Sequence, residues 1–146
     1  MESDRLVDAV RLYPDVKRRA EGMVADYRRM VALEDRFDDE EQRKSMDDFQ
    51  RRKFTGDLSK LYAALLAAER EDEAPEVGAL LIQTLDVPES RLSLVQAALE
   101  ASKHPPELGR WLDEAEAAGA NVRSLRRRLA KAMEGSPVPA AGDEPR

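Results

Sequence analysis

Apolar residues recur every three or four positions along the first third of the chain. From residue 16 the spacing alternates between four and three, and the positions are Val16, Ala20, Met23, Tyr27, Met30, Glu34 and Phe37. This period predicts a long amphipathic helix, and it is also the pattern of a coiled coil. Two interpretations stay open, a helix packed on its own domain and a helix that self-associates. Glu34 lies on the apolar seam and argues against self-association.

Two segments flank this pattern. Residues 5–13 predict a short helix that ends before Pro14, and Pro14 and Asp15 then suit the first turn of the next helix. Residues 38–53 are highly charged, with only Met46 and Phe49 as large apolar side chains. This charged segment is either a continuation of the long helix or a flexible connector, and in both cases its charges are expected to face solvent.

Five shorter apolar patterns follow from residue 54, each with a helix-start signal. The openings are Thr55-Gly56-Asp57, Pro75-Glu76, Pro88-Glu89, Pro105-Pro106-Glu107 and Asn121. Proline fixes φ at the first helical turn, and an acid there complements the positive end of the helix dipole. Gly119 is expected to end the fourth helix as a C-terminal cap. The Pro-Glu openings are unevenly spaced, so they indicate no solenoid repeat.

These patterns predict an all-α fold. We expect a compact bundle of about five short helices over residues 54–134, preceded by a long charged amphipathic helix in an N-terminal extension over 1–53. The extension is a candidate coiled coil, and the Pro/Gly-rich segment 135–146 is expected to be disordered. Aromatic residues make up only 5% of the chain, so Leu, Val, Ala and Met must form the core, and this composition suits helix packing.

The composition argues against most catalytic and metal chemistry. The chain has no cysteine and one histidine, His104, so disulfides, thiolate metal sites, paired-histidine sites and a Ser-His-Asp triad are excluded. Its acids are mostly consecutive, and consecutive side chains on a helix do not converge. We therefore expect no cofactor, no metal and no enzymatic activity. The acid-containing N-terminus and the lack of a long apolar run predict a cytoplasmic protein without a membrane segment.

The last predicted helix carries the candidate partner-binding residues. Arg123, Arg127 and Lys131 form a stripe opposite Val122, Leu125, Leu129 and Met133, which are expected to face inward, and Arg126 belongs to the same basic group. Three interpretations of this stripe stay open: a solvated polar face, a surface for an acidic protein partner or a second copy, and a nucleic-acid contact. The net charge of −6 argues against nucleic-acid binding by a global positive field.

One segment suggests a family. FTGDLSKLYAALLAAE (54–69) has an apolar-Thr-Gly start and a leucine-rich helix, and LVQAALEAS (94–102) leads to ELGRWLDEAEAAGANVRSLRRRL (107–129). This stretch resembles the effector-associated domains of bacterial conflict and signalling proteins. The resemblance implies a small helical, death-domain-like adaptor that pairs homotypically and recruits effector enzymes.

The leading hypothesis is a non-enzymatic protein–protein interaction module that binds a protein partner or itself through helix surfaces. The alternative is a small helical subunit of a nucleic-acid-bound complex that contacts phosphates through Arg123, Arg126, Arg127 and Lys131. Trp111 fits the inward face of its helix, and we expect it in the core.

Overall fold

A computed structural model describes residues 7–10 and 15–134, and within them the chain forms helices and no strands. The elements are α2 (Val16–Leu33), the short 3-10 helix η1 (Glu34–Arg36), α3 (Glu40–Ala67), α4 (Ala74–Thr84), α5 (Pro88–Glu100), α6 (Glu107–Ala117) and α7 (Arg123–Glu134). Residues 7–10 are also helical. The all-α prediction is confirmed. The rest of the helix expected over 5–13 and the tail 135–146 lie outside the described residues.

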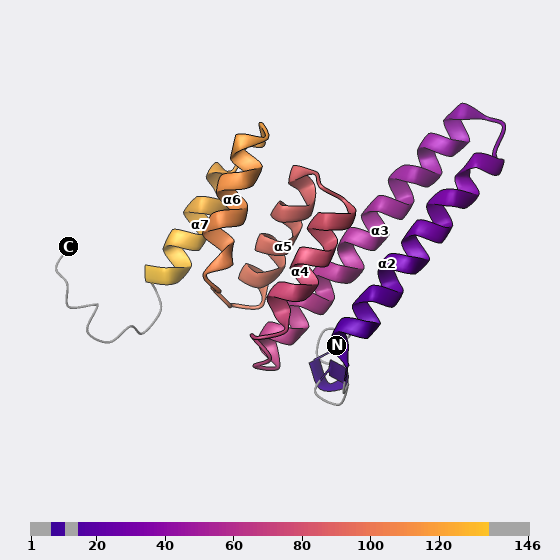
Figure 1. The fold of residues 1–146 in the computed structure, drawn as a ribbon. Helices are drawn as coiled ribbons and strands as arrows, with labels where there is room; N and C mark the ends of the chain where they lie inside the picture. Colours follow the sequence, from indigo (N-terminus) through magenta and orange to yellow (C-terminus); the bar gives the residue numbers. More distant parts are fainter. Residues whose placement is uncertain (1–6, 11–14, 135–146) are drawn as a thin grey trace.

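The helices follow one another across the molecule roughly in chain order (Figure 1). Helices α2 and α3 form a long antiparallel hairpin at one end, and α6 and α7 lie at the other. Helix α3 packs against α2, α4 and α5, and α5 packs against α6 and α7. The tip of the α2–α3 hairpin, at residues 34–39, extends past the neighbouring helices and is far from α7.

The charged segment after α2 does not continue that helix. Phe37 is extended, with ψ 128°, and Asp39 caps a new helix by accepting a hydrogen bond from the Glu41 amide at 2.8 Å. Glu40 and Glu41 then occupy its first turn, where carboxylates are stabilised by the helix dipole. The acidic run at 38–41 is therefore a helix-start signal. The chain reverses direction there, and residues 40–53 become the first half of α3.

The helix start expected at Thr55-Gly56-Asp57 is wrong, because α3 passes through it without a break. Asp57 does not cap a helix; its side chain pairs with Lys53 one turn earlier at 3.0 Å. Phe54 is buried, so this turn is anchored to the core despite the roughly 1 kcal/mol that a mid-helix glycine costs. The boundary drawn between residues 53 and 54 thus lies inside one helix, and one apolar cluster joins Val16 and Val24 to Leu58.

The centre of the core is built around two aromatic rings. Tyr62 of α3 and Trp111 of α6 are almost fully buried, with ring centroids 5.4 Å apart and planes tilted by 59°. The Tyr62 hydroxyl donates to Glu107 Oε2 at 2.8 Å, which satisfies the one polar group of this ring. Burial, followed by the hydrogen bond to Glu107, raises the pKa of Tyr62. The prediction that Trp111 belongs to the core is confirmed.

Three helices end with a residue in the left-handed region. Gly119 has φ +98° after α6, as expected for a C-terminal cap, while Glu69 after α3 and Ser102 after α5 have φ 62° and 60°. The next amide in each case bonds back to a carbonyl inside the helix; for example, the Lys103 amide donates to the Ala98 carbonyl at 2.9 Å. These caps reverse the chain sharply, and two of them do so without glycine.

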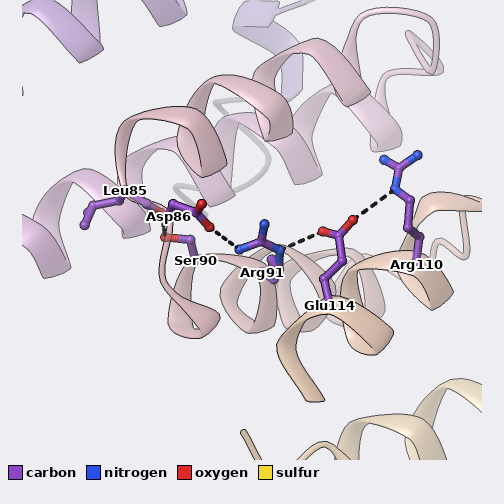
Figure 2. A network of polar contacts seen from close by, with 6 residues as sticks. All are labelled: Leu85, Asp86, Ser90, Arg91, Arg110 and Glu114. Carbon is purple, nitrogen blue, oxygen red and sulfur yellow. Dashed lines mark hydrogen bonds and ion pairs between the residues drawn. The ribbon is translucent and has the colours of Figure 1, made fainter. Parts of the chain in front are cut away.

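A polar network fixes α5 against α6 (Figure 2). Arg91 pairs with Asp86 at 2.9 Å and with Glu114 at 2.7 Å, and Glu114 also lies 3.9 Å from Arg110. The buried Ser90 hydroxyl donates to the Leu85 carbonyl at 2.7 Å and ties the preceding loop to the start of α5. The charges in this network are mutually neutralised and hold helices together.

Candidate protein-interaction surfaces

The four predicted basic residues divide into two groups on α7. Arg123, Arg127 and Lys131 are exposed and form a basic ridge on its outer side. Among the described residues, no carboxylate lies within ion-pair distance of these three side chains. The inward face is less covered than expected. Val122 is buried and Leu125 and Leu129 are partly buried, but Met133 is 54% exposed.

Arg126 belongs to the second group, because it points back to α6. Its guanidinium lies 2.6 Å from Asp113 and 2.9 Å from Glu116. The hydrogen bonds to Asp113 and then Glu116 raise the pKa of Arg126. These two acids lie one turn apart on α6, and the structure places Arg126 between them. Arg126 therefore serves α6–α7 packing and contributes little free charge to the basic ridge.

Exposed apolar side chains gather on the hairpin and not on α7. Of the large apolar residues exposed in the described part of the chain, only Met133 lies outside α2 and α3; the others are Met30, Leu33 and Phe49. Phe49 is 50% exposed and Met30 is 38% exposed, whereas Trp111 is 2% exposed. Large apolar side chains that gather on one part of a protein surface can mark a binding site.

Met30 and Phe49 border a groove between α2 and α3, which we call the hairpin groove. It has a volume of about 440 Å³, and its lining is Met23, Asp26, Tyr27, Arg29, Met30, Phe49, Gln50, Lys53, Phe54 and Asp57. Tyr27 and Phe54 stack inside it with centroids 4.4 Å apart and planes 16° from parallel. The groove is apolar along its centre and charged at its edges.

The charged edges of the hairpin groove are already neutral. Asp26 pairs with Arg29 at 2.6 Å on α2, and Lys53 pairs with Asp57 at 3.0 Å on α3. Exposed pairs of this kind stabilise a fold by less than about 1 kcal/mol, so they are free to exchange partners. The groove therefore suits a partner with an apolar centre and balanced charges around it.

A buried acid lies beside the groove, close to the hairpin tip. Glu34 is 9% exposed, and its Oε2 has no hydrogen-bond partner among the described residues. Burial first, then the charge of Asp47 and a hydrogen bond to it, raise the pKa of Glu34. Asp47 in turn pairs with Arg51 at 2.9 Å. Glu34 lies on the seam of α2, as the sequence indicated, but it faces α3 of the same chain.

A second, shallower groove lies between α3 and α5. Six of its nine lining residues are polar or charged, and Ser59 and Ser93 share a hydrogen bond of 2.7 Å across it. Lys60, Glu89 and Glu100 are its charged residues. This bond joins the two helices, and no large apolar side chain is exposed there, so the surface is a weaker candidate for protein binding than the hairpin groove.

No cluster for metal or acid–base chemistry forms in the described residues. His104 is partly buried in the turn before α6, and no group of three His, Cys, Asp or Glu side chains is arranged to hold a metal ion within 7–10 and 15–134. The acids that approach one another are bound to arginines at Arg91 and Arg126. The candidate binding sites on the described surface are therefore the exposed faces of helices.

Sequence reasoning selected the basic helix and missed the hairpin groove. The apolar seam through Met23, Tyr27 and Met30 was visible, but the side of α3 that completes the groove was read as a solvated charged segment. Phe49 was the available signal, because it follows Met46 by three residues, a spacing that places two apolar side chains on one helix face amid the charges.

None of the helices in the described residues is both long and apolar enough to cross a membrane. Comparisons of the chain with protein-family models, with curated proteins and with solved structures find no match.

Proposed function

We propose that this protein is a non-enzymatic protein–protein interaction module whose binding surface is the hairpin groove. One observation carries the proposal: Phe49 and Met30 are both exposed at the hairpin groove, whereas Tyr62 and Trp111 of the bundle are buried. A partner that covers Phe49 and Met30 explains their exposure.

The groove specifies the chemistry of that partner. A hollow between two antiparallel helices accepts a third helix, whose apolar side chains at i, i+3 and i+4 enter the space between them. Phe49 and Met30 are the expected anchors, because large side chains near the centre of an interface contribute most of its affinity. The edge pairs Asp26–Arg29 and Lys53–Asp57 require alternating charges at the rim of the partner.

The resemblance of residues 54–129 to effector-associated domains extends this proposal to a biological role. An adaptor in a bacterial signalling or defence system needs one surface for a partner and a stable body to present it. The α4–α7 bundle is such a body, and the protruding hairpin presents the groove at one end of it (Figure 1). This role is part of the proposal.

Site-specific crosslinking tests the proposed binding surface. A photoreactive phenylalanine derivative is placed at Phe49, and at Gln83 as a control, since Gln83 is exposed on α4 and lines neither groove. We expect a crosslinked protein with the probe at position 49 and none at position 83. The captured protein, once purified, should bind the wild type and lose binding to Phe49→Asp. Equal crosslinking at both positions would contradict the proposal.

The basic ridge of α7 supports a second candidate function, the binding of nucleic-acid phosphates. Arg123, Arg127 and Lys131 are exposed with no carboxylate partner among the described residues, which suits a backbone contact. Filter binding at low salt with single- and double-stranded DNA and RNA tests it. Retention that is lost in Arg127→Glu/Lys131→Glu supports this function. An absence of retention at low salt excludes it.

A further inference from the structure

We infer that the partner covering the hairpin groove is the same groove of a second copy of this chain. The two α2–α3 hairpins pair antiparallel about a twofold axis through the groove centre and form a four-helix arrangement. This inference rests on the proposed function, since it takes the groove to be a protein-binding surface. Three features of the hairpin favour a second copy as the occupant.

The first feature is that one face of the hairpin has both a groove and exposed side chains that can enter the groove of a second copy. Phe49 and Met30 are largely exposed, and they stand at the border of a cavity of about 440 Å³. In a twofold interface the side chains of each copy enter the groove of the other. A face that pairs with the same face of a second copy therefore needs both a groove and side chains that fit it. Antiparallel helix pairs commonly assemble into four-helix bundles by this kind of interlocking.

The second feature is the distribution of charge along the hairpin. On α2 the groove is bordered by Met23 and Met30; Arg18 precedes the first by five residues, and Asp35 follows the second by five. At 1.5 Å per residue each of these charges lies about 8 Å beyond its end of the groove. They are therefore at similar distances from its centre, on opposite sides.

A twofold axis through the groove centre exchanges those two ends. It places the hairpin tip of one copy beside the start of α2 in the other. The tip is acidic, with five acids and one base over residues 35–41, and the start of α2 is basic, with three consecutive bases over 17–19. All of these acids and bases are exposed. Antiparallel pairing thus brings opposite charges together twice, whereas parallel pairing would bring acid to acid and base to base.

The third feature is the neutral rim. Asp26–Arg29 and Lys53–Asp57 contribute two acids and two bases, so the rims of two copies do not repel each other. Each pair is formed within one helix and is exposed, and it can exchange partners across the interface at little cost. A groove with a single sign of charge would have excluded a second copy.

Sedimentation velocity over a wide range of protein concentration tests the inference. We expect the wild type to pass from monomer to dimer, and Phe49→Asp to weaken dimerisation by about thirtyfold or more, as for the loss of a central anchor at an interface. Phe49 is half exposed, so the variant should keep the helical circular dichroism of the wild type. Gln83→Glu on α4, outside both grooves, should leave dimerisation unchanged. A wild type that stays monomeric at every concentration would overturn the inference.

A charge exchange gives an independent test that does not depend on Phe49. Lys17→Glu/Arg18→Glu and Asp35→Lys/Asp38→Lys should each dimerise less than the wild type, because the first places acids against the acidic tip and the second leaves the tip with no net charge to pair with the bases. Mixed together, the two variants should form a heterodimer, since the unchanged acidic tip of the first then meets the unchanged basic start of α2 in the second. Added salt should weaken the wild-type dimer. Failure of the mixture to associate would count against the antiparallel register.

Other outcomes identify other assemblies. If Asp35→Lys/Asp38→Lys associates only with Arg127→Glu/Lys131→Glu, the copies join head to tail through the basic ridge of α7, and the twofold inference is wrong. If the wild type is monomeric and the photoreactive probe at position 49 captures a different protein, the proposed function stands and the inference fails. If the wild type is monomeric and the probe captures nothing, both fail.

Discussion

The two halves of helix α3 lie in different surroundings. In its C-terminal half, from Leu58 to Leu66, α3 is packed against α4 and α5, and the ring and hydroxyl of Tyr62 are both satisfied. In its N-terminal half, α3 contacts only the hairpin partner, Phe49 is half exposed, and Glu34 beside it keeps a carboxyl oxygen without a hydrogen-bond partner among the described residues. One continuous helix thus joins a region with a complete core to a region with an incomplete one.

This difference separates the part of the chain that stabilises the fold from the part that carries the proposed binding surface. Burial of apolar surface is the main stabilising term, so the bundle half holds the fold together. The hairpin half buries less than it could, and the surface it leaves exposed is available to a partner. Substitutions in the two halves should therefore have opposite signatures: loss of stability in the bundle, and loss of association in the hairpin.

The largest expected effect separates the two halves directly. Trp111→Ala removes a ring that is 2% exposed at the centre of the bundle and should cost about 3–5 kcal/mol of unfolding free energy. Phe49→Ala removes a ring that is 50% exposed and should cost about 1 kcal/mol or less. Urea unfolding measures both. Similar costs for the two variants would remove the distinction between the halves.

Replacement of either of two glycines by alanine should change the stability by a smaller amount, with opposite signs at the two positions. A Cβ on Gly78 of α4 would lie 2.6 Å from Trp111 Cη2, so Gly78→Ala should destabilise the protein by about 1–3 kcal/mol through overpacking. Gly56 of α3 has no heavy atom within 4 Å of such a Cβ, so Gly56→Ala should stabilise it by about 0.5–1 kcal/mol, the ordinary gain in a helix interior. Thermal unfolding of both variants should give shifts of opposite sign. A stabilising Gly78→Ala would show that Trp111 is loosely held.

The caps of the bundle should improve by a smaller amount. Ser102 has φ 60° and is exposed, so Ser102→Gly should relieve left-handed strain and stabilise the protein by about 0.5–1 kcal/mol. The preceding cap residue Ala101 has φ −87°, and Ala101→Gly should destabilise it, which controls for a general effect of glycine. Equilibrium denaturation measures the two changes. A loss of stability in both variants would contradict the strain at Ser102.

The smallest expected effect is a pH dependence at the hairpin. Burial and the charge of Asp47 raise the pKa of Glu34 in the folded state, so the folded protein binds this proton more tightly than the unfolded chain does. The resulting stabilisation is present below the unfolded pKa and is lost as the pH rises through the raised folded pKa. Glu34→Gln should abolish this loss and be more stable than the wild type at neutral pH.

Urea midpoints measured from acidic to neutral pH test this dependence. Asp48 is exposed and is not among the charges that shift the pKa of Glu34, so Asp48→Asn is the control and should keep the wild-type slope. An unchanged slope in Glu34→Gln would show that the carboxyl group is not confined by the hairpin as described.

Local signals in the sequence identified most helices correctly. Pro75 and Pro88 lie in the first turns of α4 and α5, Gly119 has the positive φ of a helix cap, and the Asn121 side chain accepts from the Arg123 amide at 3.1 Å. These signals are reliable because each acts within a few residues. The helix start expected at Thr55 was wrong. The Lys53–Asp57 pair and the burial of Phe54 favour a continuous helix there.

Partner choice among charged side chains was beyond local reasoning. Arg126 and Arg127 are adjacent and chemically identical, yet one binds Asp113 and Glu116 of α6 and the other faces solvent. A rotation of about 100° per residue separates them, and only the position of α6 decides which direction is occupied.

The amino-acid sequence alone determined that this protein is built of helices, because apolar period, proline and glycine act over one or two turns. It also determined which residues of α7 carry charge and which residues of α2 form an apolar seam. Only the tertiary structure decided that residues 34–39 reverse the chain, so that α3 lies antiparallel to α2 and the hairpin groove forms between Tyr27 and Phe54. The reason is that a groove belongs to two helices at once, and its shape depends on contacts between residues distant in sequence.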